Sequence, residues 1–389
     1  MTWGSMPPGP KFADKYYIQP FNQVLIKDFK AMNVTHDTFS IRKAFRISIA
    51  AALALFSFST INDAFACATC GCSLSTDAAT GYSASTGWRV SADYSFINQD
   101  QLRTGTGTIS PAQVAAINDA GGNQEVEHQT INRYLTFGLS YSPSADWNYR
   151  LLTPFIGRSH TTYGAASNPL TPDQLSGASV DSLGDIKFIV SYQGVLPTHN
   201  LGFQLGVKLP TGDYGGPSAS GTGTVGRNPV SFGTGGNSGG QLLDTSLQAG
   251  TGSTDLIIGG YYYQPVSQNF DAFLNGQFQA AVMEKLDQVG ADYRPGNLAT
   301  VSVGMRYEAN PGIVPQLQVN ITRKSAELGT LADTADTAGT VAYLSPGISA
   351  NVIKNTQMYA FVQLPLYSHL DGYQLFPHYT ATVGISHAF

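Results

Sequence analysis

The chain has 389 residues, of which 42% are hydrophobic, 11% aromatic and only 12% charged, with a formal net charge of −5. Soluble domains carry about 25% charged residues, so this chain has about half the usual share. The many aromatic residues exclude an intrinsically disordered chain, and the lack of a basic run argues against binding of nucleic acid. The 42 glycines and 20 tyrosines suit a protein with an apolar outside and a small, polar inside.

The N-terminal part of the chain contains one continuous apolar run, residues 47–58. This run is too short for a transmembrane helix, which needs ~20 residues. Basic residues precede it at positions 42–46, and the small-residue site Ala64-Phe65-Ala66 follows it. This order predicts a secretory signal peptide that is cleaved before Cys67, with an uncleaved anchor as the alternative.

Three regions follow from that prediction. Residues 1–31 do not fit a signal peptide, and Met32 offers a more ordinary start, so residues 1–66 are expected to be an upstream extension plus the signal peptide. Residues 67–87 would form a periplasmic tether rich in Ser, Thr, Ala and Gly. Residues 88–389 would form the folded body.

The folded body shows alternation of apolar and polar residues with period two. Residues 201–209 read LGFQLGVKL, with Leu, Phe, Leu, Val and Leu on one face of a strand. Each such segment is about ten residues long, and a tilted membrane strand needs ~9–11. The segments are 88–97, 133–142, 147–156, 184–193, 200–209, 254–264, 270–281, 297–307, 314–323, 341–353, 356–367 and 379–389.

The connections between these segments alternate between long and short without exception. The long ones are 98–132, 157–183, 210–253, 282–296, 324–340 and 368–378. Outer-membrane barrels have long external loops and short periplasmic turns, whereas a soluble sandwich has no reason to sort its loops this way. The sequence therefore predicts an all-β fold: a closed antiparallel transmembrane β-barrel of about twelve strands in the outer membrane of a Gram-negative cell.

The two faces of such strands have different surroundings. Apolar residues would face lipid, and the polar face would line the interior. The candidates for lining the lumen are Lys187, Gln204, Lys208, Arg306, Gln316 and Gln318. Aromatic residues that share the apolar phase at the periplasmic strand ends are candidates for the membrane interface. These are Tyr141, Trp147, Tyr149, Tyr192, Tyr262 and Tyr307, with Phe155, Tyr367 and Tyr379 expected at the outer rim.

The last segment carries a candidate assembly signal. Its apolar phase runs through Tyr379, Val383 and Ile385 and ends on the C-terminal Phe389. This pattern resembles the terminal signal that bacterial barrels present to the barrel assembly machinery, which is therefore an expected partner.

Three short motifs carry a family resemblance: Leu183-Gly184-Asp185, Lys208–Asp213 and Gly250–Asp255. They resemble the outer-membrane transporter family labelled "MetA pathway of phenol degradation", over roughly residues 183–389. The resemblance implies a barrel that takes up small aromatic or hydrophobic molecules, and it supplies no catalytic residues. The residues themselves favour structural roles, because Gly and Asp suit tight or bulged backbone and Pro210 cannot donate to a strand ladder.

All three cysteines lie together as Cys67, Cys70 and Cys72. In an exported protein they can form a disulfide and leave one free thiol. Three thiolates and a freed α-amine could instead hold Cu(I) or Zn(II). Lipidation of Cys67 is a further alternative, although Phe65 makes a poor lipobox. The tether would place this cluster at the periplasmic mouth, where it could meet a periplasmic partner.

Other chemistry finds little support in the sequence. No nucleophile elbow, Walker loop or zincin motif occurs, so the chain is not expected to be an enzyme. His128, His160 and His378 fall in predicted external loops and are expected to be solvated. The Gly-, Ser- and Thr-rich residues 210–253 predict a flexible or infolded loop that could narrow a pore.

The sequence thus predicts an outer-membrane channel for passive passage of small solutes, surrounded by lipid and without a cofactor in the barrel. Two alternatives remain: a barrel that handles metal through its cysteine cluster, and a structural or adhesive barrel without transport.

Overall fold

The computed structural model describes residues 86–310 and 312–389. The predictions for the signal peptide, for Cys67, Cys70 and Cys72, and for residues 67–85 of the tether lie outside these residues, and Gly87 at the end of the predicted tether already belongs to the first strand. No helix in the described ranges is long and apolar enough to cross a membrane. The only α-helix there is α3 (Pro111–Asp119), a short helix opened by a capping box between Ser110 and Gln113.

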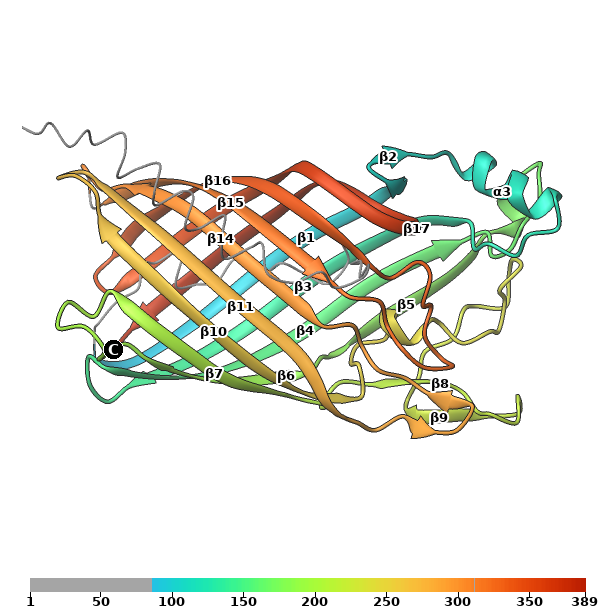
Figure 1. The fold of residues 1–389 in the computed structure, drawn as a ribbon, viewed down its shortest axis with the longest axis horizontal. Helices are drawn as coiled ribbons and strands as arrows, with labels where there is room; N and C mark the ends of the chain where they lie inside the picture. The colour runs from blue at the N-terminus through green and yellow to red at the C-terminus, as the bar shows by residue number, and fades with distance from the viewer. Residues whose placement is uncertain (1–85, 311) are drawn as a thin grey trace, which may run out of the picture. The chain divides into compact units, whose positions relative to one another are not determined.

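The described residues form one large antiparallel sheet that closes on itself (Figure 1). The path runs β17-β16-β15-β14-β11-β10-β7-β6-β4-β3-β1, and pairing of β1 with β17 seals it. The strands are β1 (Gly87–Gly105), β3 (Glu127–Ser142), β4 (Trp147–Thr162), β5 (Ser176–Leu183), β6 (Ile186–Tyr192), β7 (Leu201–Leu209), β10 (Ser253–Pro265), β11 (Phe270–Glu284), β14 (Leu298–Tyr307), β15 (Ile313–Lys324), β16 (Gly339–Ile353) and β17 (Thr356–Ala388).

Strand β17 crosses the wall twice. Its first part, residues 356–370, pairs with β16, and its second part, residues 374–388, pairs with β1. Both pairings are antiparallel, and Gly372 between the two parts has φ of +51°, as a tight reversal requires. The closed path of eleven strands therefore makes twelve crossings, which confirms the barrel predicted from the alternation.

The outer face of the wall is apolar and the inner face is polar. On β7 the outward side chains include Phe203 and Leu205, which are 54% and 58% exposed, whereas the inward Lys208 is 4% exposed. On β15 the inward side chains Gln316, Gln318 and Asn320 are all buried. A soluble barrel would show the reverse order, so the distribution suits a barrel in lipid.

The strands extend further than the alternation indicated. β1 continues to Gly105, β3 begins at Glu127 and β4 continues to Thr162, all inside the expected loops 98–132 and 157–183. Beyond the apolar belt, outward positions such as Asp100 and Arg133 are polar and exposed. The hydrophobic alternation therefore stops at the edge of the belt, although backbone pairing continues. The expectation that His128, His160 and His378 lie in loops was wrong, and all three are on strands. The error arose because these parts of the strands lie beyond the apolar belt and show no hydrophobic alternation.

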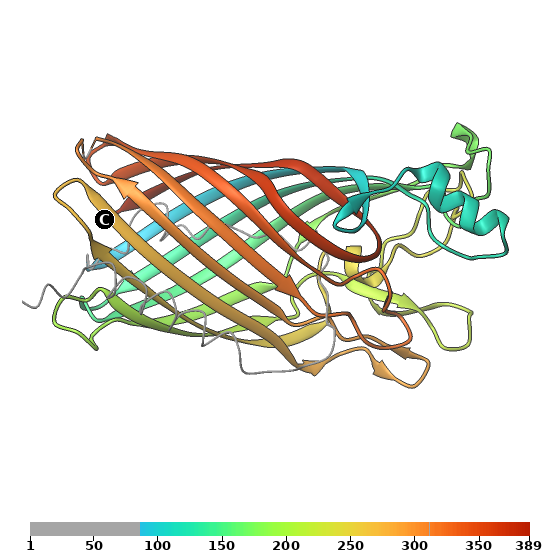
Figure 2. The ribbon, with the colours of Figure 1, turned by 45° about the horizontal axis from the view of Figure 1, so that its top comes forward.

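The remaining short elements gather at one end of the barrel. They are β2 (Gly107–Thr108), η1 (Pro172–Gln174), β8 (Tyr214–Pro217), β9 (Thr224–Arg227), η2 (Thr245–Leu247), β12 (Asp287–Gln288) and β13 (Ala291–Asp292). Figures 1 and 2 show these elements and the long loops at one end, and the short turns, the start of β1 and the C-terminus at the other. The end with the long loops is the extracellular end of an outer-membrane barrel.

Candidate functional site: the lumen and a polar clamp at its outer end

The six lumen candidates lie on the inner face of the wall. Lys187, Gln204 and Lys208 come from β6 and β7, on positions that alternate with the exposed apolar side chains. Arg306 on β14 forms an ion pair with Glu308 at 3.0 Å. Gln316 donates to Ser349 Oγ at 3.1 Å, while both amide atoms of Gln318 are buried without a hydrogen-bond partner. Contact of these residues with a solute stays a prediction.

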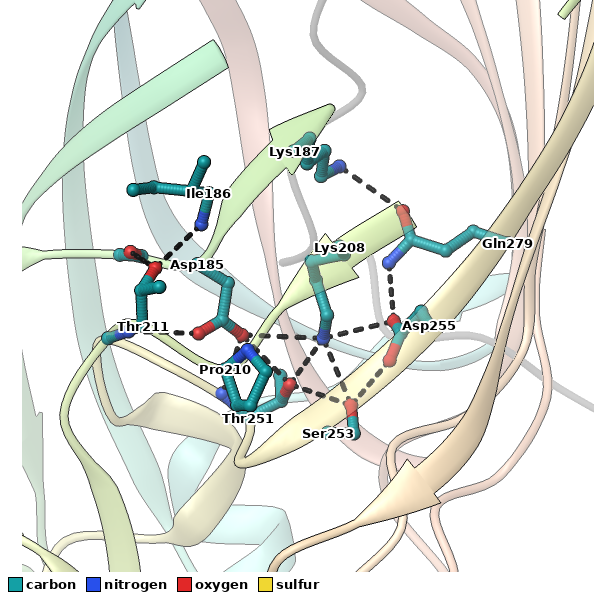
Figure 3. A network of polar contacts seen from close by, with 12 residues as sticks. Asp185, Ile186, Lys187, Lys208, Pro210, Thr211, Thr251, Ser253, Asp255 and Gln279 are labelled. Carbon is teal, nitrogen blue, oxygen red and sulfur yellow. Dashed lines mark hydrogen bonds and ion pairs between the residues drawn. The ribbon is translucent and has the colours of Figure 1, made fainter. Parts of the chain in front are cut away.

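Lys208 is the centre of a polar cluster near the outer end of the lumen (Figure 3). Its ammonium group lies 3.3 Å from Asp185 Oδ2 and 3.0 Å from Asp255 Oδ2. It also donates to the hydroxyls of Thr251 and Ser253. All three charged side chains are at least 90% buried. We call Asp185, Lys208, Thr251, Ser253 and Asp255 the clamp.

Asp185 ties the two stems of the 210–252 loop together. Its Oδ1 accepts the amide hydrogen of Gly212 at 3.0 Å, on the stem that leaves β7. Its Oδ2 accepts both the amide and the hydroxyl of Thr251 at 3.0 Å, on the stem that enters β10. A Cβ on Gly212 would lie 2.8 Å from the Cα of Gly250, so the stems approach as closely as they do only because glycine is present.

The carboxylates of the clamp are fully hydrogen-bonded. Asp255 Oδ1 accepts from Ser253 at 2.5 Å, and its Oδ2 accepts from Gln279 Nε2 at 2.6 Å. Gln279 Oε1 in turn accepts from Lys187 at 3.2 Å. Lys208 thus pairs with both aspartates, and Lys187 is linked to Asp255 through Gln279. Every side-chain polar atom of the clamp has a partner, which is the condition under which buried charges are tolerated.

The local sequence explains why the three motifs meet here. β5 and β6 both pair with β4, and Gly184 and Asp185 interrupt them as a bulge that turns the carboxylate inward. Pro210 ends β7, after which Thr211 Oγ1 accepts from the amide of Ile186 at 2.8 Å. The register then sets Lys208 opposite Asp255. The motifs Leu183-Gly184-Asp185, Lys208–Asp213 and Gly250–Asp255 are parts of one structural unit.

The 210–252 loop folds against the inner face of the wall. Arg158 on β4 donates to the carbonyl oxygens of Leu247 and Gln248, to Asn132 Oδ1 and to Tyr134 Oη. An apolar cluster joins the loop to β5, made of Ala178, Val180, Phe232, Leu243, Leu247 and Ala249. Of the predicted choices, flexible or infolded, the structure shows the infolded loop.

Aromatic rings on the inner face pack onto glycines in the periplasmic half of the wall. Tyr261 lies opposite Gly202, Phe273 opposite Gly304, and Phe361 opposite Gly347 in the strand registers. A Cβ on these glycines would lie 2.2, 2.6 and 2.1 Å from the facing ring. Tyr359 covers Gly384 in the same manner. The glycines thus give the rings room to lie flat against the wall.

The predicted interface aromatics lie at the periplasmic strand ends. Tyr141, Trp147, Tyr149, Tyr262 and Tyr307 are exposed there, and Tyr192 is half-buried with its ring centroid 4.7 Å from Trp147. Two further aromatic residues that were not predicted join them: Trp88 packs on Tyr141 with ring centroids 4.6 Å apart, and Phe270 packs on Tyr307 at 4.9 Å. Both share the apolar phase, which was the available signal. Phe155, Tyr367 and Tyr379 are also exposed, and contact of all these rings with the interface stays a prediction.

The C-terminal residues present their apolar side chains outward. Tyr379, Val383, Ile385 and Phe389 are all exposed, and the amide of Phe389 donates to Trp88 O at 2.9 Å. Their recognition by the assembly machinery stays a prediction. Among residues 86–310 and 312–389, no group of three or more His, Cys, Asp and Glu side chains is spaced to hold a metal ion.

Comparison with known proteins supports the fold. No family model matches the chain, and no curated protein matches it. The COG4313 outer membrane channel from Pseudomonas putida F1 matches with a TM-score of 0.52 and 10% identity, covering 78% of this chain and 96% of that one. The β domain of the Bordetella autotransporter BrkA (TM-score 0.42, 12% identity, 78% and 100% coverage) and the CymD monoaromatic hydrocarbon channel (0.40, 10%, 78% and 89%) also match.

At 10% identity the first of these similarities establishes the fold and nothing more. The chain therefore has the fold of an outer-membrane β-barrel. The resemblance drawn from the three motifs is confirmed to that extent, and its narrower family label stays a prediction.

Proposed function

We propose that the chain is a passive channel for small solutes in the outer membrane of a Gram-negative cell. The observation that carries the proposal is the sealed wall with an apolar outside and a polar inside. A sheet in lipid must satisfy every backbone hydrogen bond, which closure achieves. A polar inner face then offers solutes a path that hydrocarbon does not.

The size of the barrel is consistent with a selective passage. A wall of twelve crossings is wider than an eight-stranded barrel, which side chains fill, and narrower than a porin. The 210–252 loop, held by Arg158 and Asp185, reduces the outer opening further. The proposal assigns no reaction and no cofactor to the barrel, so the driving force is the concentration gradient of the solute.

Small aromatic or hydrophobic compounds are the solute class that we propose within this function. The resemblance of the three motifs to the phenol-degradation transporter family supports it. We further propose that the C-terminal strand is the part that the barrel assembly machinery recognises.

The test uses the purified full chain. In planar bilayers we expect stepwise conductance, and in liposomes we expect swelling with small solutes. Phenylalanine and leucine form a matched pair for the solute class, since both are zwitterions and differ in the ring. Faster entry of phenylalanine supports an aromatic preference, and equal rates contradict it. Absence of both conductance and swelling contradicts the channel and favours a structural barrel.

A further inference from the structure

A second polar cluster lies at the extracellular end, and it differs from the clamp in that its carboxylates have no lysine or arginine partner in the described ranges. Its carboxylates come from separate segments: Glu125 just before β3, Glu127 at the start of β3, Asp244 in the 210–252 loop, and Asp336 in the loop between β15 and β16. We call these four residues and the inward-facing His160 on β4 the acidic vestibule. All lie beyond the apolar belt, whose edge on β3 is Arg133.

Contacts between the segments bring these carboxylates together. Glu127 Oε2 accepts the amide of Leu375 at 3.0 Å, and Asp336 Oδ1 accepts the amide of Tyr373 at 2.9 Å, so both flank the tip of β17. Thr245, which follows Asp244, and Leu331, in the loop that carries Asp336, meet around Gly216. The 210–252 loop therefore touches the loop between β15 and β16.

The lysine and arginine side chains near the acidic vestibule bind other groups and not its carboxylates. Lys324 is paired with Glu327 at 2.6 Å. Arg158 donates to backbone carbonyls of the 210–252 loop, and Arg103 donates to Thr106 O and lies 5.1 Å from the ring centroid of Phe376. In the described ranges, no lysine or arginine nitrogen lies within 4.0 Å of the carboxylates of Glu127, Asp244 or Asp336.

The uncompensated charge alters proton binding. Enclosure by the surrounding loops, and then the charges of Glu125, Asp333 and Glu327, raise the pKa of Asp244 to about 8, although its side chain stays in contact with water. Enclosure and the charge of Asp333 raise the pKa of Asp336 to about 6, with Glu125 and Asp371 adding to it. Enclosure and the charge of Glu125 also raise the pKa of Glu127. Glu127, Asp244 and Asp336 therefore hold protons closer to neutral pH than ordinary carboxyl groups do, whereas the facing His160 outweighs enclosure and lowers the pKa of Glu125.

His160 supplies an independent sign of a missing partner. Its side chain is fully buried, its ring centroid lies 5.9 Å from that of Phe232, and its Nδ1 is 2.8 Å from Thr130 Oγ1. Its Nε2 has no hydrogen-bond partner and faces Glu125 Oε1 across 4.0 Å. This separation is too long for a hydrogen bond. Glu125 is 35% exposed, so solvent reaches its carboxylate, whereas His160 Nε2 is shielded from solvent.

The geometry of this gap fits a nitrogen with several N–H bonds. For a nitrogen placed about 2.8 Å from both His160 Nε2 and Glu125 Oε1, the angle between the two contacts is roughly 90°. This is near the angle between two N–H bonds of an ammonium group. In the tautomer that donates from Nδ1 to Thr130, Nε2 and the carboxylate both present lone pairs to that position. A bare metal ion needs more preformed ligands than the described residues bring together.

We propose that the acidic vestibule binds a small cation bearing a primary ammonium group, held between Glu125 and His160 and neutralised by Glu127, Asp244 and Asp336. The inference rests on the proposed function, in that this cation is a solute that the channel admits at its outer mouth. Its binding displaces protons from the carboxylates, so it strengthens as the pH rises.

The test is a titration of ¹³C-methylammonium with the full chain in lipid nanodiscs. Binding is measured as broadening of the ¹³C NMR signal of the probe. Tetramethylammonium, which has the same charge and no N–H, is the matched probe. We expect broadening of methylammonium at pH 8.5, at least a fivefold weaker effect at pH 5.5, and little effect on tetramethylammonium. Equal broadening of the two probes would show unspecific attraction to charge and would overturn the proposal. No broadening of either probe would also overturn it, because only water or protons would then occupy the gap.

Variants separate the site from general surface charge. Glu125→Gln and Asp244→Asn are expected to reduce methylammonium binding at least threefold, and His160→Leu is expected to remove the difference between the two probes. Asp287→Asn changes the charge equally at an exposed position on β12 and is expected to have no effect. The comparison of probes in the unmodified chain keeps the test valid if a variant does not fold.

Conductance of the same preparation distinguishes the two proposals. Channel steps without methylammonium binding overturn the ammonium site and leave the channel intact. Binding without conductance or swelling leaves the site and overturns the proposed function on which its role in transport rests.

Discussion

The clamp and the acidic vestibule are both polar clusters at the outer end of one barrel, yet their charges are handled in opposite ways. In the clamp, Lys208 lies between Asp185 and Asp255, and every polar atom has a partner (Figure 3). In the acidic vestibule, carboxylates from separate loops meet without a lysine or arginine at 4.0 Å, and His160 Nε2 has no hydrogen bond.

This difference separates a structural from a ligand-binding role. A buried charge that is paired and fully hydrogen-bonded fixes backbone geometry and leaves nothing for a ligand to supply. A cluster with excess charge and an unpaired buried nitrogen is incomplete by the same criterion. We therefore assign loop anchoring to the clamp and solute binding to the acidic vestibule.

Removal of the central lysine tests the clamp most severely. Lys208→Met leaves Asp185 and Asp255 buried without a cation, which costs about 3–5 kcal/mol of unfolding free energy. Urea unfolding in micelles, followed by tryptophan fluorescence, measures this loss. The triple variant that also carries Asp185→Asn and Asp255→Asn should recover part of it. Unchanged stability in Lys208→Met would show that the clamp is not a structural unit.

Neutralisation of one acid in the clamp should loosen the 210–252 loop. Asp185→Asn removes a charged acceptor for the amides of Gly212 and Thr251, and hydrogen bonds to charged groups contribute about 1.5–3 kcal/mol. We expect faster thermolysin cleavage within the loop and larger single-channel conductance. Cleavage at the rate of the unmodified chain contradicts the anchoring role.

Gly347, in the barrel wall outside both polar clusters, gives a stability change with which the effects above can be compared. In Gly347→Ala the new Cβ meets the ring of Phe361 at 2.1 Å, and overpacking of this kind costs about 1–3 kcal/mol. Gly276→Ala on β11 is the control, because its Cβ meets nothing within 4 Å. Equal stabilities of the two variants would mean that the ring-on-glycine contacts do not hold the wall.

The smallest effect is expected from pH. Raised pKa values mean that the folded loops bind more protons than the unfolded chain between pH ~4 and ~8. Loop stability should therefore fall as the pH rises through this range, and protease cleavage of the external loops should increase a few-fold. Asp244→Asn should flatten the dependence of cleavage on pH and so slow cleavage at high pH. Asp185→Asn, in contrast, is expected to make cleavage faster. Loops that become more resistant with rising pH contradict the account.

The sequence predicted the barrel because lipid imposes a strict pattern on every crossing. All outward positions in the belt must be apolar, so each crossing shows the alternation and the crossings can be counted. Past the belt, outward residues such as Asp100 and Arg133 face water, the constraint ends, and the strand extensions are invisible to periodicity. For the same reason His160 was predicted in a loop, although it lies on β4.

The two polar clusters were predictable to different degrees. The clamp lies within the three motifs that the sequence analysis singled out, and Lys208 and Asp255 are direct neighbours once β7 and β10 pair. The acidic vestibule combines Glu125, Asp244 and Asp336, which no strand register connects. Only the packing of the external loops brings them together, and no spacing in the sequence records it.

Single-channel recording of the purified full chain in planar bilayers tests the central claim most directly. A sealed wall with a polar interior predicts discrete conductance steps, with a preference for cations over anions that increases from pH 5.5 to pH 8.5. A preparation that is folded and inserted, yet shows neither steps nor swelling of liposomes with small solutes, contradicts the account.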